Sequence, residues 1–318
     1  MKPIKRVLLA NISAIVVLNC LTAFGQGSLT PPGAPAPTMK SLDQIEPRMP
    51  VDATHTPGNN SEQFIISQPG SYYLTTNIVG VSNKDGIKIA ANNVTLDLNG
   101  FSLLAASNGI YGIYISVPGS PTYGKNSIVV RNGIISGWRA FGVYSFVDGV
   151  ALEHLNISGN FQDGVEFVGG GVIEDCTVSG NGGNGIYVQG YSVVSGCWIK
   201  YNEGNGIWLA GPHSAIWGNV CLGNNTGNNT NAAGIYVFGS NNRIEGNHIT
   251  GSATSGNGIL IYDSVDFGSV NNIVIKNSVE GNGTNNYYFG TNQIVGPIIC
   301  NTATGIITNS NPWANFSF

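Results

Sequence analysis

The sequence is poor in charged side chains, which make up only 9% of its 318 residues. Its formal net charge is −4, and lysine and arginine are not gathered into a basic stripe anywhere along the chain. Proteins that bind nucleic acid present such a stripe to the phosphate backbone. The composition therefore argues against a nucleic-acid partner.

Long apolar runs are also missing, apart from one stretch over residues 7–18. Lysine and arginine precede this stretch, and the small-residue sequence Ala23-Phe24-Gly25 follows it, which is the pattern of a secretory signal peptide. We expect residues 1–25 to be this signal and the mature protein to be secreted, in the periplasm or outside the cell. The stretch is too short to span a bilayer, and no later segment replaces it, so we expect no membrane span.

Cysteine is scarce, with five residues, and neither a Cys-X-X-Cys motif nor a histidine-rich segment indicates a zinc site. Cys20 lies within the expected signal peptide. A second interpretation is therefore a lipoprotein acylated at Cys20, although the bulky Asn19 is unusual directly before such a cysteine.

Proline is concentrated in residues 26–60, which hold seven of the 14 prolines of the chain. Because proline favours extended backbone, we predict a Pro-rich linker or loose arm there. The remaining residues, 61–318, form a repeat region.

Glycine is abundant, with 45 residues, and it marks a phrase of the form Gly-apolar-X-apolar that recurs every 21 to 30 residues. Self-similarity at this period predicts a solenoid, in which each coil buries its apolar side chains against its neighbours. The phrase begins at Gly86, Gly112, Gly142, Gly164, Gly185, Gly206, Gly234 and Gly258.

Aligning the phrases predicts three short strands in each coil, because apolar residues alternate with a period of two. The first strand should bury residues such as Ile186 and Ile207, with Ser145 as the one polar exception in the column. In the coil near residue 130, we expect Val129 and Ile134 to point inward. A polar column should mark one corner, with Leu155 as its odd member: Asn99, Asn132, Cys176, Cys197, Asn219, Asn247 and Asn277.

The segment Asn93-Val94-Thr95-Leu96-Asp97-Leu98-Asn99-Gly100 and the Gly-Ile-Tyr-Val phrases resemble the right-handed parallel β-helix repeat proteins of the pectate-lyase-like superfamily. The resemblance covers residues 61 to 305 and implies an all-β, single-stranded right-handed parallel β-helix of about eight to nine coils. It also implies an N-terminal cap at residues 64–74 and a C-terminal aromatic cap of Trp313, Phe316 and Phe318.

The middle residue of each Gly-apolar-X-apolar phrase should point outward. Stacked coils repeat every ~4.8 Å, close to the length of one sugar unit, and aromatic rings suit the apolar face of a pyranose. The resemblance places a polysaccharide groove on this same face. We therefore take as candidate ligand residues Tyr114, Tyr144, Glu166, Tyr187, Trp208 and Tyr236, between Lys88 at one end and Leu260 at the other.

Two other interpretations of this stripe stay open. Aromatic residues favour strands and stack on one another, so the stripe would then be a structural ladder. Exposed apolar surface also marks protein-binding faces.

Catalytic signatures are absent. The Asn-Thr-Asp, Asp-Asp and Gly-His-Gly motifs of polygalacturonases and the Asp-Pro-His motif of alginate epimerases do not occur. Asp163 and Glu166 would lie ~10 Å apart and on opposite sides of a regular strand, so we do not interpret them as an acid/base pair. His213, in the turn after Trp208, is a lone histidine that we take as a surface residue.

Glu153 and Glu174 should stack on adjacent coils, beside His154 and Asp175. A bound Ca²⁺ would relieve their repulsion, and the alternative is a tolerated acidic patch. Cys176 and Cys197 should also be adjacent, as a disulfide or as two buried thiols. We assign no other cofactor and no catalytic residue.

We therefore expect a secreted β-helix protein that binds extracellular or cell-wall polysaccharide. A variant of this hypothesis is that the protein also processes the polysaccharide. The alternatives are a structural or adhesin-like surface solenoid without activity, and a polysaccharide lyase or epimerase with an atypical site.

Overall fold

The computed structural model describes residues 47–119, 126–252, 255–262, 268–300 and 309–318. The expected signal peptide, Cys20 and most of the expected linker lie outside these residues. The chain divides into two units, Met1–Pro47 and Arg48–Phe318. Every strand described below belongs to the second unit, which is all-β.

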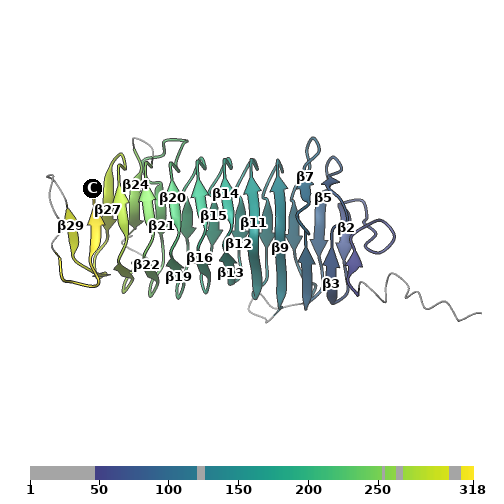
Figure 1. Ribbon diagram of the computed structural model, residues 1–318, viewed down its shortest axis with the longest axis horizontal. Helices are drawn as coiled ribbons and strands as arrows, with labels where there is room; N and C mark the ends of the chain where they lie inside the picture. Colours follow the sequence, from purple (N-terminus) through teal and green to yellow (C-terminus); the bar gives the residue numbers. More distant parts are fainter. Residues whose placement is uncertain (1–46, 120–125, 253–254, 263–267, 301–308) are drawn as a thin grey trace, which may run out of the picture. The chain divides into compact units, whose positions relative to one another are not determined.

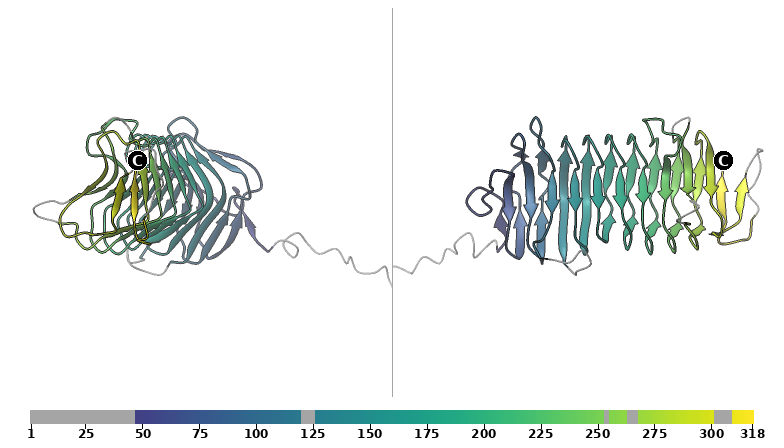
Figure 2. Two further views of the ribbon diagram at one scale, coloured as in Figure 1. Left: turned by 60° about the vertical axis from the view of Figure 1, so that its left-hand side comes forward. Right: turned by 180° about the vertical axis from the view of Figure 1, so that it is seen from behind.

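One parallel sheet contains one strand from each coil. Figures 1 and 2 show these strands side by side in successive coils. Its ten strands, in spatial order, are β2 (Glu62–Ile66), β5 (Asp85–Ile89), β8 (Ile113–Ile115), β10 (Val143–Ser145), β12 (Val165–Phe167), β15 (Ile186–Val188), β18 (Ile207–Leu209), β21 (Ala233–Val237), β24 (Asn257–Ile261) and β27 (Asn285–Phe289).

The other two strands of each coil join into a single 20-stranded sheet. They join because β9 and β11 run without a break through the corner that separates two strands elsewhere. Its members are β1 (Met49–Pro50), β3 (Gly70–Tyr73), β4 (Ile78–Val79), β6 (Val94–Asp97), β7 (Ser102–Leu104), β9 (Ile128–Ser136), β11 (Val150–Ser158), β13 (Gly171–Glu174), β14 (Thr177–Ser179), β16 (Val193–Ser195), β17 (Trp198–Lys200), β19 (Ala215–Trp217), β20 (Val220–Leu222), β22 (Arg243–Glu245), β23 (His248–Thr250), β25 (Ile273–Ile275), β26 (Ser278–Glu280), β28 (Ile294–Val295), β29 (Ile298–Cys300) and β30 (Asn315–Ser317).

The interior between the sheets is apolar, as alternation predicts. Ile186 and Ile207 are fully buried, and so are their equivalents in the other Gly-apolar phrases. Ser145 is buried too, and it is satisfied locally: its Oγ donates to the carbonyl of Val147 at 3.1 Å and accepts from the Val147 amide at 3.3 Å. A serine is tolerated there because no polar atom is left without a partner.

The register of β9 differs from our expectation by one residue. Val130, not Val129, is opposite Leu96 and Leu152 in the buried column. Ile135 is buried and Ile134 is partly exposed. Two adjacent apolar residues at each point leave the alternation ambiguous, and cross-strand pairing then decides which one is buried.

Asparagine ladders line the corners. Asn219 donates from Nδ2 to Oδ1 of Asn247 at 3.0 Å, and Asn247 donates in the same way to Asn277. A second ladder, less fully anticipated from the sequence, links Asn160, Asn181, Asn202 and Asn224 at 2.9 Å per step. Each side-chain amide forms a hydrogen bond with the asparagine of the adjacent coil, so these buried polar groups have partners and the coils are held in register.

Asn99 and Asn132 do not join these ladders, contrary to expectation. Both are exposed, with φ of 54° and 59°. Gly133 is opposite Leu155 instead. Both asparagines thus turn the chain at exposed left-handed positions, which asparagine tolerates better than most residues.

The first coil starts earlier than the sequence indicated. Met49 and Pro50 pair with Tyr72 and Tyr73 of β3, so residues 48–51 pack against the first coil of the β-helix. Within residues 64–74, the end of β2 and all of β3 are strands of that coil. The buried carboxylate of Asp97 is 3.7 Å from Arg48 and 3.2 Å from Arg131. This ion pair holds part of the expected linker against the helix.

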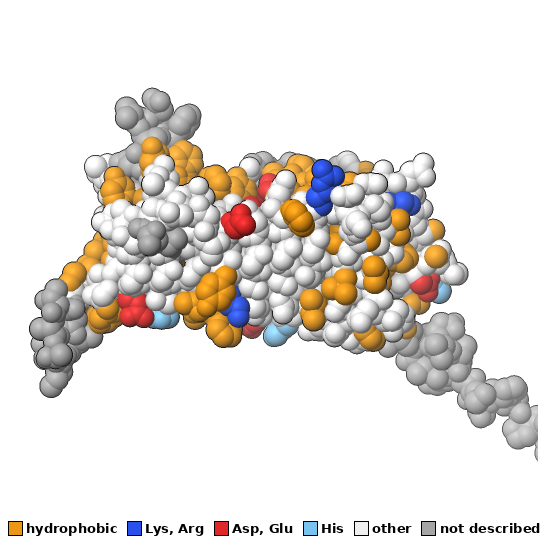
Figure 3. Space-filling view, turned by 90° about the horizontal axis from the view of Figure 1, so that it is seen from above, with side chains coloured by type: hydrophobic (Ala, Val, Ile, Leu, Met, Phe, Trp, Pro, Cys, Tyr) orange, Lys and Arg blue, Asp and Glu red, His pale blue; other side chains and the backbone are white. Residues whose placement is uncertain are grey.

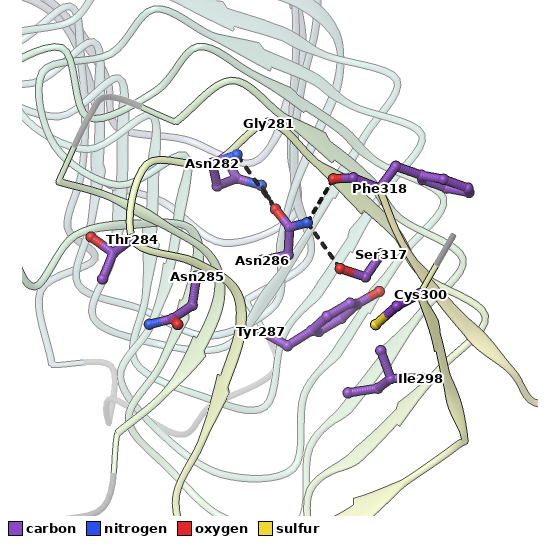
Figure 4. Close-up of a pocket in the computed structure, with 10 residues that line it drawn as sticks. All are labelled: Gly281, Asn282, Thr284, Asn285, Asn286, Tyr287, Ile298, Cys300, Ser317 and Phe318. Atoms are coloured by element: carbon purple, nitrogen blue, oxygen red, sulfur yellow. Dashed lines mark hydrogen bonds between the residues drawn. The ribbon is translucent and has the colours of Figure 1, made fainter. Parts of the chain in front are cut away.

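At the other end, β30 pairs with β26 and β29, and Asn315 completes the ladder by accepting from Asn277. Figure 4 shows a pocket at this end, where the amide of Asn286 bonds Asn282, Ser317 and the carbonyl of Phe318. Trp313 and Phe318, expected to cover this end, are each about half exposed.

Candidate functional site

The outward stripe lies on the ten-stranded sheet in the predicted register. Each residue is opposite the next one in the column, from Lys88 through Tyr114, Tyr144, Glu166, Tyr187, Trp208 and Tyr236 to Leu260. All of them are partly exposed except Leu260, which is buried. The stripe is thus a column of mainly aromatic side chains, one from each successive strand of the parallel sheet.

The aromatic rings fall into two groups, one on each side of Glu166. In the first, Tyr144 contacts Phe141 at 4.9 Å and Phe146 at 4.7 Å between centroids. In the second, Trp208 contacts Tyr187 and Tyr236 edge to face. The Nε1 atom of Trp208 is buried and has no hydrogen-bond partner. The indole of Trp208 is therefore partly exposed on the stripe and partly packed against its neighbours.

Sequence reasoning missed the aromatic residues that flank the stripe. Tyr111 and Phe141 stack in parallel, with 5.8 Å between centroids and 1° between ring planes. Each directly precedes the glycine of a repeat phrase, and Phe146 directly follows a first strand. Tyr111 and Phe141 could have been found from the sequence, because each is an aromatic residue directly before the glycine that begins a repeat phrase.

Glu166 lies at the centre of the stripe between Tyr144 and Tyr187. Burial, together with the negative charge of Asp163, raises the pKa of Glu166 to about 7. Burial, together with Glu166, raises the pKa of Tyr144 to about 12. Glu166 thus changes its charge near neutral pH, while Tyr144 stays a neutral donor and acceptor.

Asp163 is buried just before β12 and accepts from Nδ2 of Asn184 at 3.1 and 3.2 Å. Its burial raises its pKa, and the Asn184 bonds oppose that effect. The negative charge of Asp163 in turn contributes to the raised pKa of Glu166.

Lys88, at the N-terminal end of the stripe, is paired. Its Nζ is 2.9 Å from Oε1 of Glu62 and lies over the Tyr114 ring at 5.2 Å. Asp85, close to both charges, has a pKa raised to about 6, mainly by burial. The lysine charge is thus offset, and the stripe as a whole is neutral to acidic.

The acidic pair on the second sheet has the predicted register, with Glu153 opposite Glu174. Glu174 accepts from Oγ of Ser195 at 3.1 Å, and His154 lies 3.7 Å from Asp175. Among the residues that the structure describes, no three His, Cys, Asp or Glu side chains are grouped to hold a metal ion. Calcium binding at this pair stays a proposal that a chelator titration can test.

Cys176 and Cys197 are both buried and both free thiols in the structure. Each Sγ donates to a carbonyl two residues back, that of Glu174 at 3.2 Å and that of Ser195 at 3.3 Å. The two cysteines thus replace asparagine rungs as small buried side chains. The ring of His213 stacks on that of Tyr191, with 5.4 Å between ring centroids.

Within the described part of the chain, no helix has the length and apolar character needed to cross a membrane.

Comparisons with known proteins agree with this architecture. The A-module of the Azotobacter vinelandii Mannuronan C-5 epimerase AlgE6 matches with a TM-score of 0.52 and 16% identity, over 78% of this chain and 90% of the module. The Dettilon tailspike protein matches with a TM-score of 0.50 and 13% identity, over 81% of this chain and 60% of the tailspike, less than two thirds of its length. The pectate lyase Pel9A matches with a TM-score of 0.47 and 18% identity, over 71% of this chain and 64% of the lyase.

No curated protein sequence matches this chain. The family model described as the right handed beta helix region matches residues 64–219 and 173–312. These matches span most of the chain and coincide with the coils described above. The chain is a member of the right-handed parallel β-helix family.

Proposed function

We propose that this chain is an exported protein that binds extracellular or cell-wall polysaccharide along the stripe of the ten-stranded sheet. The observation that carries the proposal is the placement of Tyr187, Trp208 and Tyr236 on three successive coils in one register. Their spacing of ~4.8 Å approaches the length of one sugar unit. Their rings offer C–H stacking surfaces, and the tyrosine hydroxyls offer hydrogen bonds.

The charges on this face favour an uncharged glycan. Glu166 and Asp163 are acidic, and the charge of Lys88 is offset by Glu62. A polyanionic chain would meet repulsion at the centre of the stripe and find its nearest cation already paired. Glu166 instead suits hydroxyl groups, to which a carboxylate or a carboxylic acid can hydrogen-bond.

The related folds support the class of ligand by analogy only. One matching structure is a mannuronan epimerase module, and function cannot be transferred from a fold shared at 16% identity. Residues 1–25 support export through their signal-peptide pattern.

Affinity electrophoresis of the mature protein, guided by a glycan array, tests the proposal. Tyr187→Leu removes the ring but keeps an apolar side chain, and Tyr187→Phe keeps the ring. We expect Tyr187→Leu to lose retention by about five-fold, the equivalent of one stacking contact, while Tyr187→Phe stays near wild type. Unchanged retention in Tyr187→Leu, or no glycan retained by the wild type, would reject it.

A second candidate is a structural or adhesin-like solenoid. It is favoured by the edge-to-face packing of Trp208 between two tyrosines and by its buried Nε1 atom. In that case Tyr187→Leu lowers the melting temperature and changes no retention.

A third candidate is a polysaccharide lyase or epimerase with an atypical site. It is favoured by Glu166, whose pKa of about 7 suits a general acid or base and whose place is the middle of the stripe. An assay for unsaturated products on uronate polymers tests the lyase, and a changed ratio of C-5 epimers in the same polymers tests the epimerase. Glu166→Gln is the control for both.

A further inference from the structure

Three aromatic side chains are exposed on the 20-stranded sheet, away from the stripe. They are Trp198, Tyr201 and Trp217, with exposed fractions of 49%, 52% and 51%. Trp198 and Tyr201 belong to β17 and the turn directly after it, and Trp217 ends β19 in the next coil. We call these three residues the corner platform. All three therefore lie within two neighbouring coils.

The backbone conformation of Tyr201 is unusual for its residue type. Its φ is 55°, in the left-handed region where a Cβ is disfavoured. The equivalent corner positions in the neighbouring coils are glycines with φ from 59° to 65°: Gly159, Gly180, Gly223, Gly251 and Gly281. A tyrosine at this position costs conformational energy that glycine avoids, and strain of this kind is concentrated at functional sites.

The next coil makes room for the Tyr201 ring. A Cβ atom placed on Gly223 would lie only 2.7 Å from the ring atom Cε1 of Tyr201. The ring therefore lies directly against the backbone at Gly223, which holds it in place on the surface. A rigid, half-exposed aromatic ring is a binding surface that loses little conformational entropy when a ligand arrives.

The two tryptophans also depart from their columns. The residues paired with Trp198 on either side are Thr177 and Val220. Those paired with Trp217 are Ser195 and Glu245. The other large aromatic residues of these columns lie several coils away, Phe316 in the Trp198 column and Tyr73 in the Trp217 column. Trp198 and Trp217, by contrast, lie in neighbouring coils.

Lys200 supplies a polar partner. Its Nζ lies 4.5 Å from the centroid of the Trp198 ring. Within the described part of the chain, Lys200 forms no ion pair, so its ammonium protons remain available to a ligand. The platform therefore combines aromatic rings with a hydrogen-bond donor that lies over one of them, the ring of Trp198.

We propose that Trp198, Tyr201 and Trp217, with Lys200, form a second saccharide-binding site, separate from the stripe. The pyranose C–H faces stack on the rings, and Lys200 donates to a hydroxyl or ring oxygen of the sugar. A protein partner fits less well, because stable protein interfaces need about 800 Å² of surface on each partner around a continuous apolar centre. Among the described residues, no two of these three rings stack on each other or meet edge to face. Figure 3 shows one face of the molecule, on which hydrophobic side chains form several patches among uncharged side chains and backbone.

The test is titration of the mature chain with cellohexaose, xylohexaose, mannohexaose and maltohexaose, followed by tryptophan fluorescence and calorimetry. Tyr201→Gly restores the residue type of its column, so we expect an equal or higher melting temperature. We also expect at least one hexasaccharide to bind about five-fold more weakly to this variant. Trp198→Ser is the second variant and should weaken the same hexasaccharide.

Tyr191→Asn is the matched control. Tyr191 is also an exposed tyrosine with positive φ, and Asn241 occupies an equivalent left-handed corner two coils on. This variant relieves similar strain and should leave binding at the corner platform unchanged. Equal loss of affinity in Tyr191→Asn and Tyr201→Gly would overturn the assignment.

Tyr187→Leu separates this proposal from the one for the stripe. The corner platform should keep its affinity in that variant even if the stripe binds nothing. The proposal is overturned if none of the four hexasaccharides binds, or if Tyr201→Gly and Trp198→Ser bind as tightly as the wild type. It is also overturned if the chain self-associates and Trp198→Ser abolishes only that association.

Discussion

The ring of Tyr187 meets the ring of Trp208 edge to face, with 5.1 Å between centroids and 85° between planes. Tyr236 contacts the same indole at 5.6 Å and 72°. The indole is thus held on two sides, and its Nε1 atom is buried. Trp208 belongs to the scaffold as much as to the surface, and its role differs from that of a freely exposed ring.

Trp208→Ala should therefore destabilise the protein by about 2 kcal/mol, because two ring contacts and a half-buried indole are lost. Chemical denaturation of the purified protein measures the change. The control is Trp217→Ala, which removes a half-exposed indole and should cost below about 0.5 kcal/mol. Equal losses in the two variants would show that Trp208 is not packed as described.

Glu166 should make stability depend on pH. Its pKa rises from 4.5 to about 7 on folding, so the folded state favours the protonated form. The stabilisation from this group is therefore complete below pH 4.5 and is lost as pH rises to about 7. Melting temperatures from pH 4 to 8 should fall more steeply for the wild type than for Glu166→Gln. If the two melting-temperature profiles ran parallel, folding would not raise the pKa of Glu166.

Asn202 should be essential to the second ladder. Its Oδ1 accepts from the backbone N of Asn181 at 3.0 Å and from Nδ2 of Asn181 at 2.9 Å. Asn202→Ala leaves both buried donors without a partner and should cost about 3 kcal/mol. Asn156→Ala, at an exposed outward position of β11, is the control and should change the free energy of unfolding little. Similar small costs at both sites would mean that the ladder does not stabilise the stack.

The thiols of Cys176 and Cys197 should both react after unfolding. Titration of the denatured mature protein without reductant should count four thiols, those of Cys176, Cys197, Cys221 and Cys300. A count of two would instead establish a disulfide. Native protein should react at the exposed Cys300, because the other three are buried.

The order of the first strands followed directly from the sequence. The glycine that begins each Gly-apolar-X-apolar phrase marks where the first strand starts, so the alternation has a fixed origin in each coil. The register of the column from Lys88 to Leu260 was therefore predicted residue by residue, although Leu260 at its end is buried. The first and last strands of that sheet, β2 and β27, lack the phrase, so the expected eight to nine coils became ten strands.

Where the sequence offers two apolar residues in a row, it does not define the register. Val129 and Val130 are equally suited to the core, and only pairing with Leu96 and Leu152 buries Val130. Tyr201 could have been noticed as a break in a glycine column. Its strain and its ring against Gly223, however, exist only once the coils are stacked.

The sequence by itself determined the fold, because a repeated apolar pattern can be buried only by stacking coil on coil. It also determined which side chains point outward, since alternation along a strand is local. Only the tertiary structure decided how far each ring is exposed and which carboxyl group has its pKa raised by burial and by a neighbouring charge. It also decided which corner carries an aromatic side chain in a strained backbone conformation. Those properties depend on contacts between coils that lie 20 or more residues apart in the chain.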